Sequence, residues 1–179
     1  MNTKSLFLFL IIAIVFKGHT QNFISEKFQK NDFKLFYNNE VSNILIDAND
    51  EKVIKTVSNH LIDDIKMVTN TKPALLSSTE NIKNDIIIIG TLGKSKWIDN
   101  LVKTKKIDVS NLKDKWETHS MQVIKNPYHK NSKALVIVGS DRRGTAFGVF
   151  ELSKQMGVSP WYWWADVPVK KKQTVIVKN

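Results

Sequence analysis

Arg142 and Arg143 are the residues whose type and position most directly suggest chemistry. They are the only arginines among 27 lysines and arginines, and they lie in a turn, residues 139–144, between an apolar run and a helical pattern. A helix N-terminus offers free backbone amides to an anion, and the planar guanidinium pairs with carboxylates through two hydrogen bonds. Two interpretations stay open. Either the pair contacts an acidic group of a uronic acid or of a neighbouring domain, or one arginine pairs locally with Asp141 or Glu151; we favour the local pairing.

The glycines of this turn do not match a nucleotide-binding motif. A phosphate loop places Lys and then Ser or Thr after its second glycine, whereas Thr145 and Ala146 follow Gly144 here. The spacing of the dinucleotide fingerprint is not met either. A nucleotide site is therefore not expected.

A block of aromatic residues near the C-terminus supplies the second candidate surface. Three of the five tryptophans, Trp161, Trp163 and Trp164, lie within four residues of one another beside Tyr162. Left exposed, they would form a larger apolar patch than monomeric soluble proteins usually carry. We expect another domain to cover the block, or the block to bind a ligand. The candidate substrate-binding or interdomain residues are Arg142, Arg143, Trp163 and Trp164.

No catalytic site can be assembled from the sequence. Cysteine is absent and the four histidines are isolated, so we expect no cysteine catalysis, no metal and no cofactor. Glycoside hydrolysis needs two carboxylates across a cleft, and the candidates are Asp141, Glu151 and Asp166. Asp141 and Glu151 occupy the positions of a helix cap and a helix surface. His60, on a helix flank, is interpreted as solvated or hydrogen-bonded rather than catalytic.

The first twenty residues have the pattern of a secretory signal. Lys4 precedes an apolar run, residues 6–16, and Gly18 and Thr20 provide small side chains for cleavage before Gln21. The run is shorter than the roughly twenty residues that span a bilayer; an uncleaved anchor is the alternative. We expect a secreted or periplasmic protein with no stable membrane insertion after cleavage.

The mature chain would carry a formal charge of +8 instead of +10, because Lys4 and Lys17 lie in the signal. Its lysines are scattered, and the only sizeable run is residues 170–172. This distribution indicates a solvated surface rather than a site for nucleic acid or anionic lipid.

Hydrophobic periodicity predicts alternating strands and helices. Strands are expected at residues 32–37, 43–47, 85–90, 119–125 and 134–138, with an edge-like piece at 73–76 and a strand or linker from 175 to 177. Helices are expected at residues 51–68, 95–102 and 142–156, with a short helical or irregular piece at 107–115. The first two strands are expected to pair, and the apolar run 85–90 is typical of a central strand covered on both faces.

These elements predict an α/β fold, with a mixed β-sheet flanked by helices in an αβ sandwich. Asn49 or Asp50 is expected to cap the first helix, and Asp141 or Ser140 the last one, which would end at Gly157. Gly144 and Gly148 share one face of that last helix, with Phe147 and Phe150 nearby. We interpret this group as close packing in the core.

Residues 139–169, GSDRRGTAFGVFELSKQMGVSPWYWWADVPV, resemble the end of the N-terminal domain of family 115 glycoside hydrolases. The resemblance implies an α/β domain that precedes a (β/α)8 barrel, in which the catalytic carboxylates lie. It also implies removal of α-1,2-linked glucuronic acid, or its 4-O-methyl ether, from xylan with inversion. Family catalytic residues have no matching positions in this chain.

The resemblance predicts three parts, a signal at residues 1–20, an accessory domain at 21–160, and an aromatic segment and linker toward a barrel at 161–179. In one hypothesis the chain is a non-catalytic part of a glucuronoxylan α-glucuronidase, and the aromatic block packs against the barrel. In the other, it is a stand-alone binding module whose aromatics stack on sugars and whose arginines hold uronate.

Overall fold

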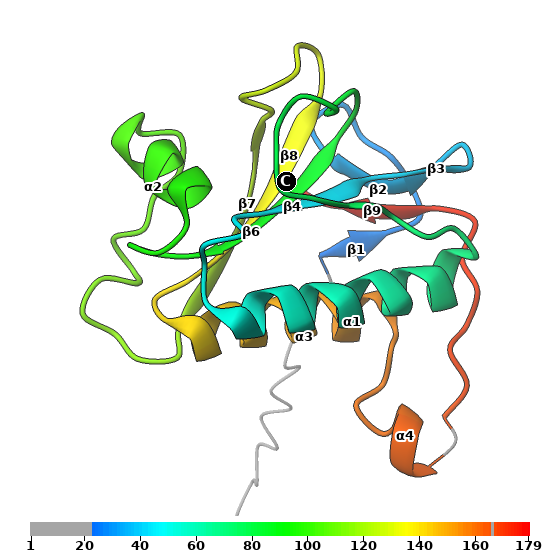
Figure 1. The fold of residues 1–179 in the computed structure, drawn as a ribbon. Helices are drawn as coiled ribbons and strands as arrows, with labels where there is room; N and C mark the ends of the chain where they lie inside the picture. Colours follow the sequence, from blue (N-terminus) through cyan, green and yellow to red (C-terminus); the bar gives the residue numbers. More distant parts are fainter. Residues whose placement is uncertain (1–22, 166) are drawn as a thin grey trace, which may run out of the picture.

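The computed structural model describes residues 23–165 and 167–179, so the predicted signal lies outside the described residues. Two β-sheets and the helices form an α/β arrangement (Figure 1). The larger sheet has the order β5-β4-β6-β8-β7. Its neighbouring strands are parallel except β7, which is antiparallel to β8. The predicted α/β class with a mixed sheet is confirmed. The strands of this sheet are β4 (Asn43–Ile46), β5 (Leu75–Leu76), β6 (Ile86–Thr91), β7 (His119–Lys125) and β8 (Lys133–Gly139).

The apolar run of β6 is covered on both faces, as predicted. Ile86 and Ile88 pack in the smaller core cluster, with helix α2 (Lys96–Lys103). Ile87 and Ile89 pack in the larger core cluster, with the two long helices described next. Successive side chains of a strand point to opposite faces, so a continuous apolar run feeds both clusters.

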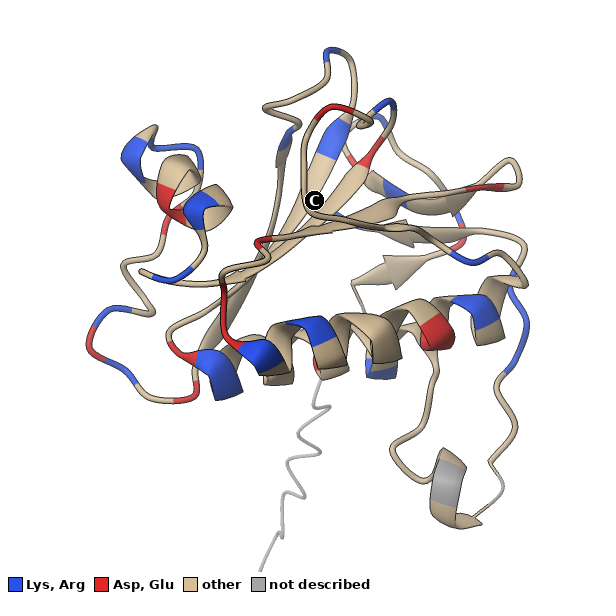
Figure 2. Ribbon diagram, in the orientation of Figure 1, with Lys and Arg blue, Asp and Glu red and all other residues tan. Residues whose placement is uncertain are grey.

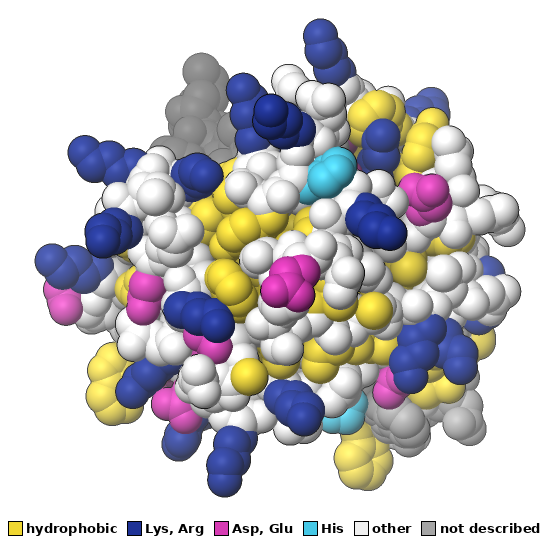
Figure 3. Space-filling model, turned by 45° about the horizontal axis from the view of Figure 1, so that its top comes forward, with side chains coloured by type: hydrophobic (Ala, Val, Ile, Leu, Met, Phe, Trp, Pro, Cys, Tyr) yellow, Lys and Arg dark blue, Asp and Glu magenta, His cyan; other side chains and the backbone are white. Residues whose placement is uncertain are grey.

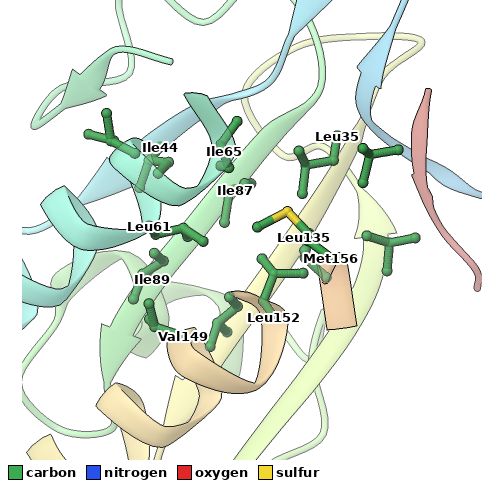
Figure 4. Packing of buried hydrophobic residues seen from close by; sticks show 14 of the residues in the cluster. Leu35, Ile44, Leu61, Ile65, Ile87, Ile89, Leu135, Val149, Leu152 and Met156 are labelled. Atoms are coloured by element: carbon green, nitrogen blue, oxygen red, sulfur yellow. The ribbon is translucent and has the colours of Figure 1, made fainter. Parts of the chain in front are cut away.

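Helices α1 (Lys52–Thr69) and α3 (Arg142–Met156) lie side by side under one face of this sheet (Figure 1). Buried side chains of both helices meet Ile87, Ile89 and Leu135 in the larger core cluster (Figure 4). The buried residues of α1 recur at steps of three and four, which is the periodicity that predicted this helix.

The predicted pairing of the first two strands is wrong. β2 (Phe33–Tyr37) pairs with β3 (Glu40–Val41) and with β9, while β4 pairs with β5 and β6. The cause is the turn at Asn38 and Asn39, whose φ values of 51° and 63° fold the chain back into a tight hairpin. The expected turn residues are correct, but the hairpin they make is β2–β3.

The second sheet is antiparallel and has the order β1-β9-β2-β3. β9 (Val175–Val177) lies between β1 (Ile24–Ser25) and β2, and its three residues are buried. Of the two possibilities for residues 175–177, a strand or a linker, the structure therefore shows the strand. This end of the segment 161–179, which we interpreted as linker, is an inner strand of the described fold.

The expected cap of α1 is also wrong. The N-cap position is Glu51, which makes no capping hydrogen bond through its side chain. Asp50 instead joins two elements, because its carboxylate accepts hydrogen bonds from the backbone N–H of Glu51 at 2.7 Å and of Thr91 at 2.8 Å. Residues 107–115 form no helix, so the irregular alternative for this piece is the observed one.

Charged residues of both signs are spread over the described helices, strands and loops (Figure 2). With the top of Figure 1 turned forward, lysine side chains stand mostly apart on the surface (Figure 3). Within the described residues, no helix combines the length and the apolar character that crossing a bilayer requires.

Candidate interaction face on helices α3 and α4

In the turn before α3, the carboxylate of Asp141 accepts hydrogen bonds from nearby backbone amides. Asp141 is the N-cap, and its Oδ1 accepts hydrogen bonds from the backbone N–H of Arg143 and Gly144, each at 2.8 Å. Its Oδ2 accepts a further one from the N–H of Glu117 at 2.7 Å. The hydrogen bond from Glu117 is the largest of several that hold the pKa of Asp141 below its usual value. The amides of Arg143 and Gly144 are thus not free to receive an external anion.

Arg143 has a local partner, but neither of the two that we expected. Its Nη1 lies 2.8 Å from Oε1 of Glu117, and its guanidinium lies 6.0 Å from the ring centre of Phe147. Glu117 comes close because β7 runs antiparallel to β8 and pairs His119 with Gly139. Arg142 is exposed.

The outer surface of α3 carries exposed aromatic rings. Phe147 and Phe150 keep 42% and 47% of their surface exposed, so placing them in core packing was wrong. The two glycines do face inward, as predicted. A Cβ on Gly144 would lie 2.3 Å from the carbonyl oxygen of Thr118, and one on Gly148 would lie 2.8 Å from Ile137.

Helix α4 (Tyr162–Ala165) stands away from the sheets, below α3 (Figure 1), and it and the residue before it carry further exposed rings. Trp161 and Trp164 are 65% and 83% exposed. The Trp163 side chain lies outside what the structure describes. The exposed rings of Phe147, Phe150, Trp161 and Trp164 are called the aromatic face below.

A groove of about 710 Å³ adjoins the aromatic face between α1, α3 and the residues before α4. Its apolar walls include Met67, Phe150 and Val158, and its polar lining includes Asp63 and Asp64 of α1. Burial raises the pKa of Asp64 and has the largest influence on it. The Ser153 hydroxyl and His60 act in the opposite direction and lower that pKa. We refer to this site as the α1–α3 groove.

The carboxylates considered for hydrolysis are not brought together as a catalytic pair. The Asp141 carboxylate already accepts hydrogen bonds from backbone amides. Glu151 accepts a hydrogen bond from the Gln155 amide at 2.8 Å, and its Oε2 lies 3.8 Å from Nζ of Lys154. Asp166 lies outside the described residues. In residues 23–165 and 167–179, no group of three or more histidine or acidic side chains could hold a metal ion.

At the carboxyl edge of the parallel strands, acidic side chains likewise accept hydrogen bonds from backbone amides. Ligands of open α/β sheets usually bind there, at the point where the chain changes direction between neighbouring strands. Here Asp47, after β4, accepts a hydrogen bond from the backbone N–H of Lys96 at 2.8 Å, at the start of α2. Together with Asp50 on Thr91, it occupies the amides that a phosphate would otherwise meet.

A solved structure provides the decisive comparison. It is described as a novel family GH115 4-O-methyl-α-glucuronidase, BtGH115A, with specificity for decorated arabinogalactans. The match has 35% identity and a TM-score of 0.63, and it covers 80% of this chain and 17% of that one. The resemblance to family 115 is confirmed. The chain therefore spans about a sixth of that relative's length.

Further comparisons add little to this relation. The structure of CpGH84D aligns at 9% identity over 87% of this chain and 22% of that one, with a TM-score of 0.45, and carries no argument. No protein-family model and no curated protein matches the sequence.

Three features could not be predicted from the sequence: the α1–α3 groove, the ion pair of Arg143 with Glu117, and the exposure of Trp116, which is 87%. Asp63 and Asp64 follow one another on a helix and resemble ordinary surface acids in the sequence. Only the packing of α3 and of residues 158–162 beside α1 makes them part of a groove.

Proposed function

We propose that this chain is a non-catalytic domain of a secreted glycoside hydrolase related to family 115 glucuronidases, and that the aromatic face docks it to the rest of that enzyme. The observation that carries the proposal is 35% identity over 80% of this chain, in a match that spans only 17% of the relative. In that relative, the matching segment is one part of a larger enzyme.

The aromatic face supports docking because large exposed aromatic rings are typical of interfaces. The four rings have 42%, 47%, 65% and 83% of their surface exposed. A (β/α)8 barrel that follows this domain in the enzyme is the partner that the family resemblance implies. Covering the rings would bury apolar surface that the described fold leaves to solvent.

The substrate of the whole enzyme is proposed from the relative's chemistry. The relative removes 4-O-methyl-glucuronic acid and is specific for decorated arabinogalactans, whereas the sequence resemblance implies glucuronoxylan. The relative's description and the sequence resemblance share the α-linked glucuronic acid, or its 4-O-methyl ether, that is removed. We therefore propose a plant polysaccharide with α-linked glucuronosyl side chains as the substrate class.

Assay of the isolated chain tests its non-catalytic role. Incubated at high concentration with oligosaccharides of glucuronoxylan and of decorated arabinogalactan, the chain should release no uronic acid, because its candidate carboxylates Asp141 and Glu151 are engaged elsewhere. Reproducible release of glucuronic acid by the chain, but not by a boiled sample, contradicts the proposal.

A stand-alone carbohydrate-binding module is the second candidate, and the exposure of Trp161 and Trp164 favours it. Flat indole faces stack on sugar rings. Arg143, however, already pairs with Glu117, which leaves Arg142 for a uronate. Retarded migration of the chain in gels containing glucuronoxylan, abolished by Trp161→Ser and Trp164→Ser, would favour this candidate over docking.

A further inference from the structure

The α1–α3 groove has an acidic end and apolar walls. Asp63 and Asp64 line it from α1, while Met67, Phe150 and Val158 supply apolar surface. Its volume of about 710 Å³ falls within the range of sites that enclose a bound group. Because Phe150 belongs both to this groove and to the aromatic face, a partner that covers the face also reaches the groove.

Within the described part of the chain, neither carboxylate forms a salt bridge with a lysine or arginine, and the basic side chain that lines the groove is His60, which acts to lower the pKa of Asp64. The salt bridges there join Arg143 to Glu117 and Lys154 to Glu151. The protein has 27 lysines and arginines against 17 acidic residues, so an acidic groove without an ion pair runs against its overall charge. Asp64 is partly buried and Asp63 is exposed, and the like charge of Asp63 beside Asp64 favours a cation next to the pair.

We infer that the groove receives an arginine or lysine side chain from the polypeptide that covers the aromatic face. The inference rests on the proposed docking function and specifies the chemistry of the partner. The aliphatic stem of such a side chain packs along Met67 and Phe150, and the cationic head reaches the carboxylates of Asp63 and Asp64. The ring of Phe150 adds a favourable face for the cation.

A uronate or a phosphate fits this groove poorly, because Asp63 and Asp64 repel an anion. A neutral sugar would use the apolar wall but gains no ionic attraction. Charge thus distinguishes the proposed occupant from the others, and the experiment is designed around charge.

The test uses the full chain and two capped tripeptides, Leu-Arg-Leu and its neutral analogue Leu-citrulline-Leu. Binding is followed by chemical-shift changes in ¹H–¹⁵N NMR spectra. The arginine peptide should shift the amides of residues 60–67 and 150–162 and bind at least about fivefold more tightly than the citrulline peptide. Equal binding of the two peptides, or shifts only elsewhere, overturns the inference.

Variants assign the effect to the carboxylates. Asp63→Asn and Asp64→Asn keep the side-chain shape and should each weaken binding of the arginine peptide, while Asp114→Asn, an exposed acid in a distant loop, should not. If a groove variant unfolds, which its own amide spectrum shows, the citrulline comparison on the native chain still decides. Tighter binding of xylobiose than of either peptide identifies a sugar site and also overturns the inference.

This experiment is independent of the docking proposal. Arginine selectivity in the groove can fail while the aromatic face still docks the domain. Conversely, the selectivity can hold in a chain whose aromatic face proves to bind sugars.

Discussion

At the residue scale, Asp141 orders the start of α3. Its carboxylate accepts three backbone hydrogen bonds, two within the helix turn and one from Glu117. One side chain thereby caps the helix and ties the preceding loop to it.

Replacing Asp141 should destabilise the fold in a pH-dependent way. Asp141→Ala should lower the free energy of unfolding by about 1 kcal/mol at pH 7, and Asp141→Asn by less, because Asn also caps helices. The folded-state pKa of Asp141 is lowered. Its charge therefore contributes stability above an unfolded-state pKa of about 3.9, and that contribution is lost as pH falls through the folded-state pKa.

Urea unfolding at pH 7 and near pH 2 measures both effects. The difference between the native chain and Asp141→Asn should shrink at the lower pH. A difference that stays constant or grows on acidification would show that the carboxylate charge contributes nothing.

The arginine pair should have unequal effects on stability. Arg143→Lys loses part of the contact with Glu117 and should cost less than about 1 kcal/mol, because the pair is exposed to solvent. Arg142→Lys is the matched control and should be neutral. Thermal unfolding of both variants checks this, and a larger loss for Arg142→Lys would reverse the assignment.

At the element scale, close contact between α3 and the strands depends on glycine. Gly144→Ala places a Cβ against the backbone carbonyl of Thr118, which cannot move as freely as a side chain. Although alanine favours helices by about 1 kcal/mol over glycine, we expect a net loss of about 1–3 kcal/mol from overpacking.

Lys154→Ala, on the exposed surface of the same helix, is the control and should change stability by less than about 0.5 kcal/mol. Chemical denaturation of both variants provides the comparison. A Gly144→Ala variant as stable as the native chain would mean that the helix has room to shift.

Local patterns in the sequence identified most helices and strands. The β-branched run of β6, the three-and-four spacing of α1 and the Gly157 cap each reflect interactions between near neighbours. Strand pairing was harder to predict, because β9 pairs with β1 and β2, which lie near the opposite end of the sequence. For the same reason, the carboxylates considered for local pairing with an arginine did not include Glu117, which β7 brings close.

At the scale of the whole molecule, exposure of the aromatic face was expected for the tryptophans but not for Phe147 and Phe150. Gly144 and Gly148 share their helix, and its small-residue face suggested that the neighbouring rings were buried as well. In the structure the glycines face the strands, and the two rings lie on the outer surface.

The isolated chain should expose enough apolar surface to associate. Trp161→Ser with Trp164→Ser should reduce binding of a hydrophobic dye and self-association, with little change in melting temperature, because both side chains are mostly exposed. Trp116→Ser, outside the aromatic face, is the control and should reduce association less. A native chain that is monomeric and binds no dye would rule out an exposed interface of this kind.

Exchange of segments within BtGH115A tests the central claim most directly. Its matching segment is replaced by this chain, either native or with Phe147, Phe150, Trp161 and Trp164 all changed to Ser, and hydrolysis of its glucuronosyl substrate is measured. We expect the native chimera to keep activity within about tenfold of the parent enzyme, whereas the serine variant should lose at least a further tenfold or unfold at lower temperature. Equal activity and equal stability of the two chimeras would contradict docking through the aromatic face.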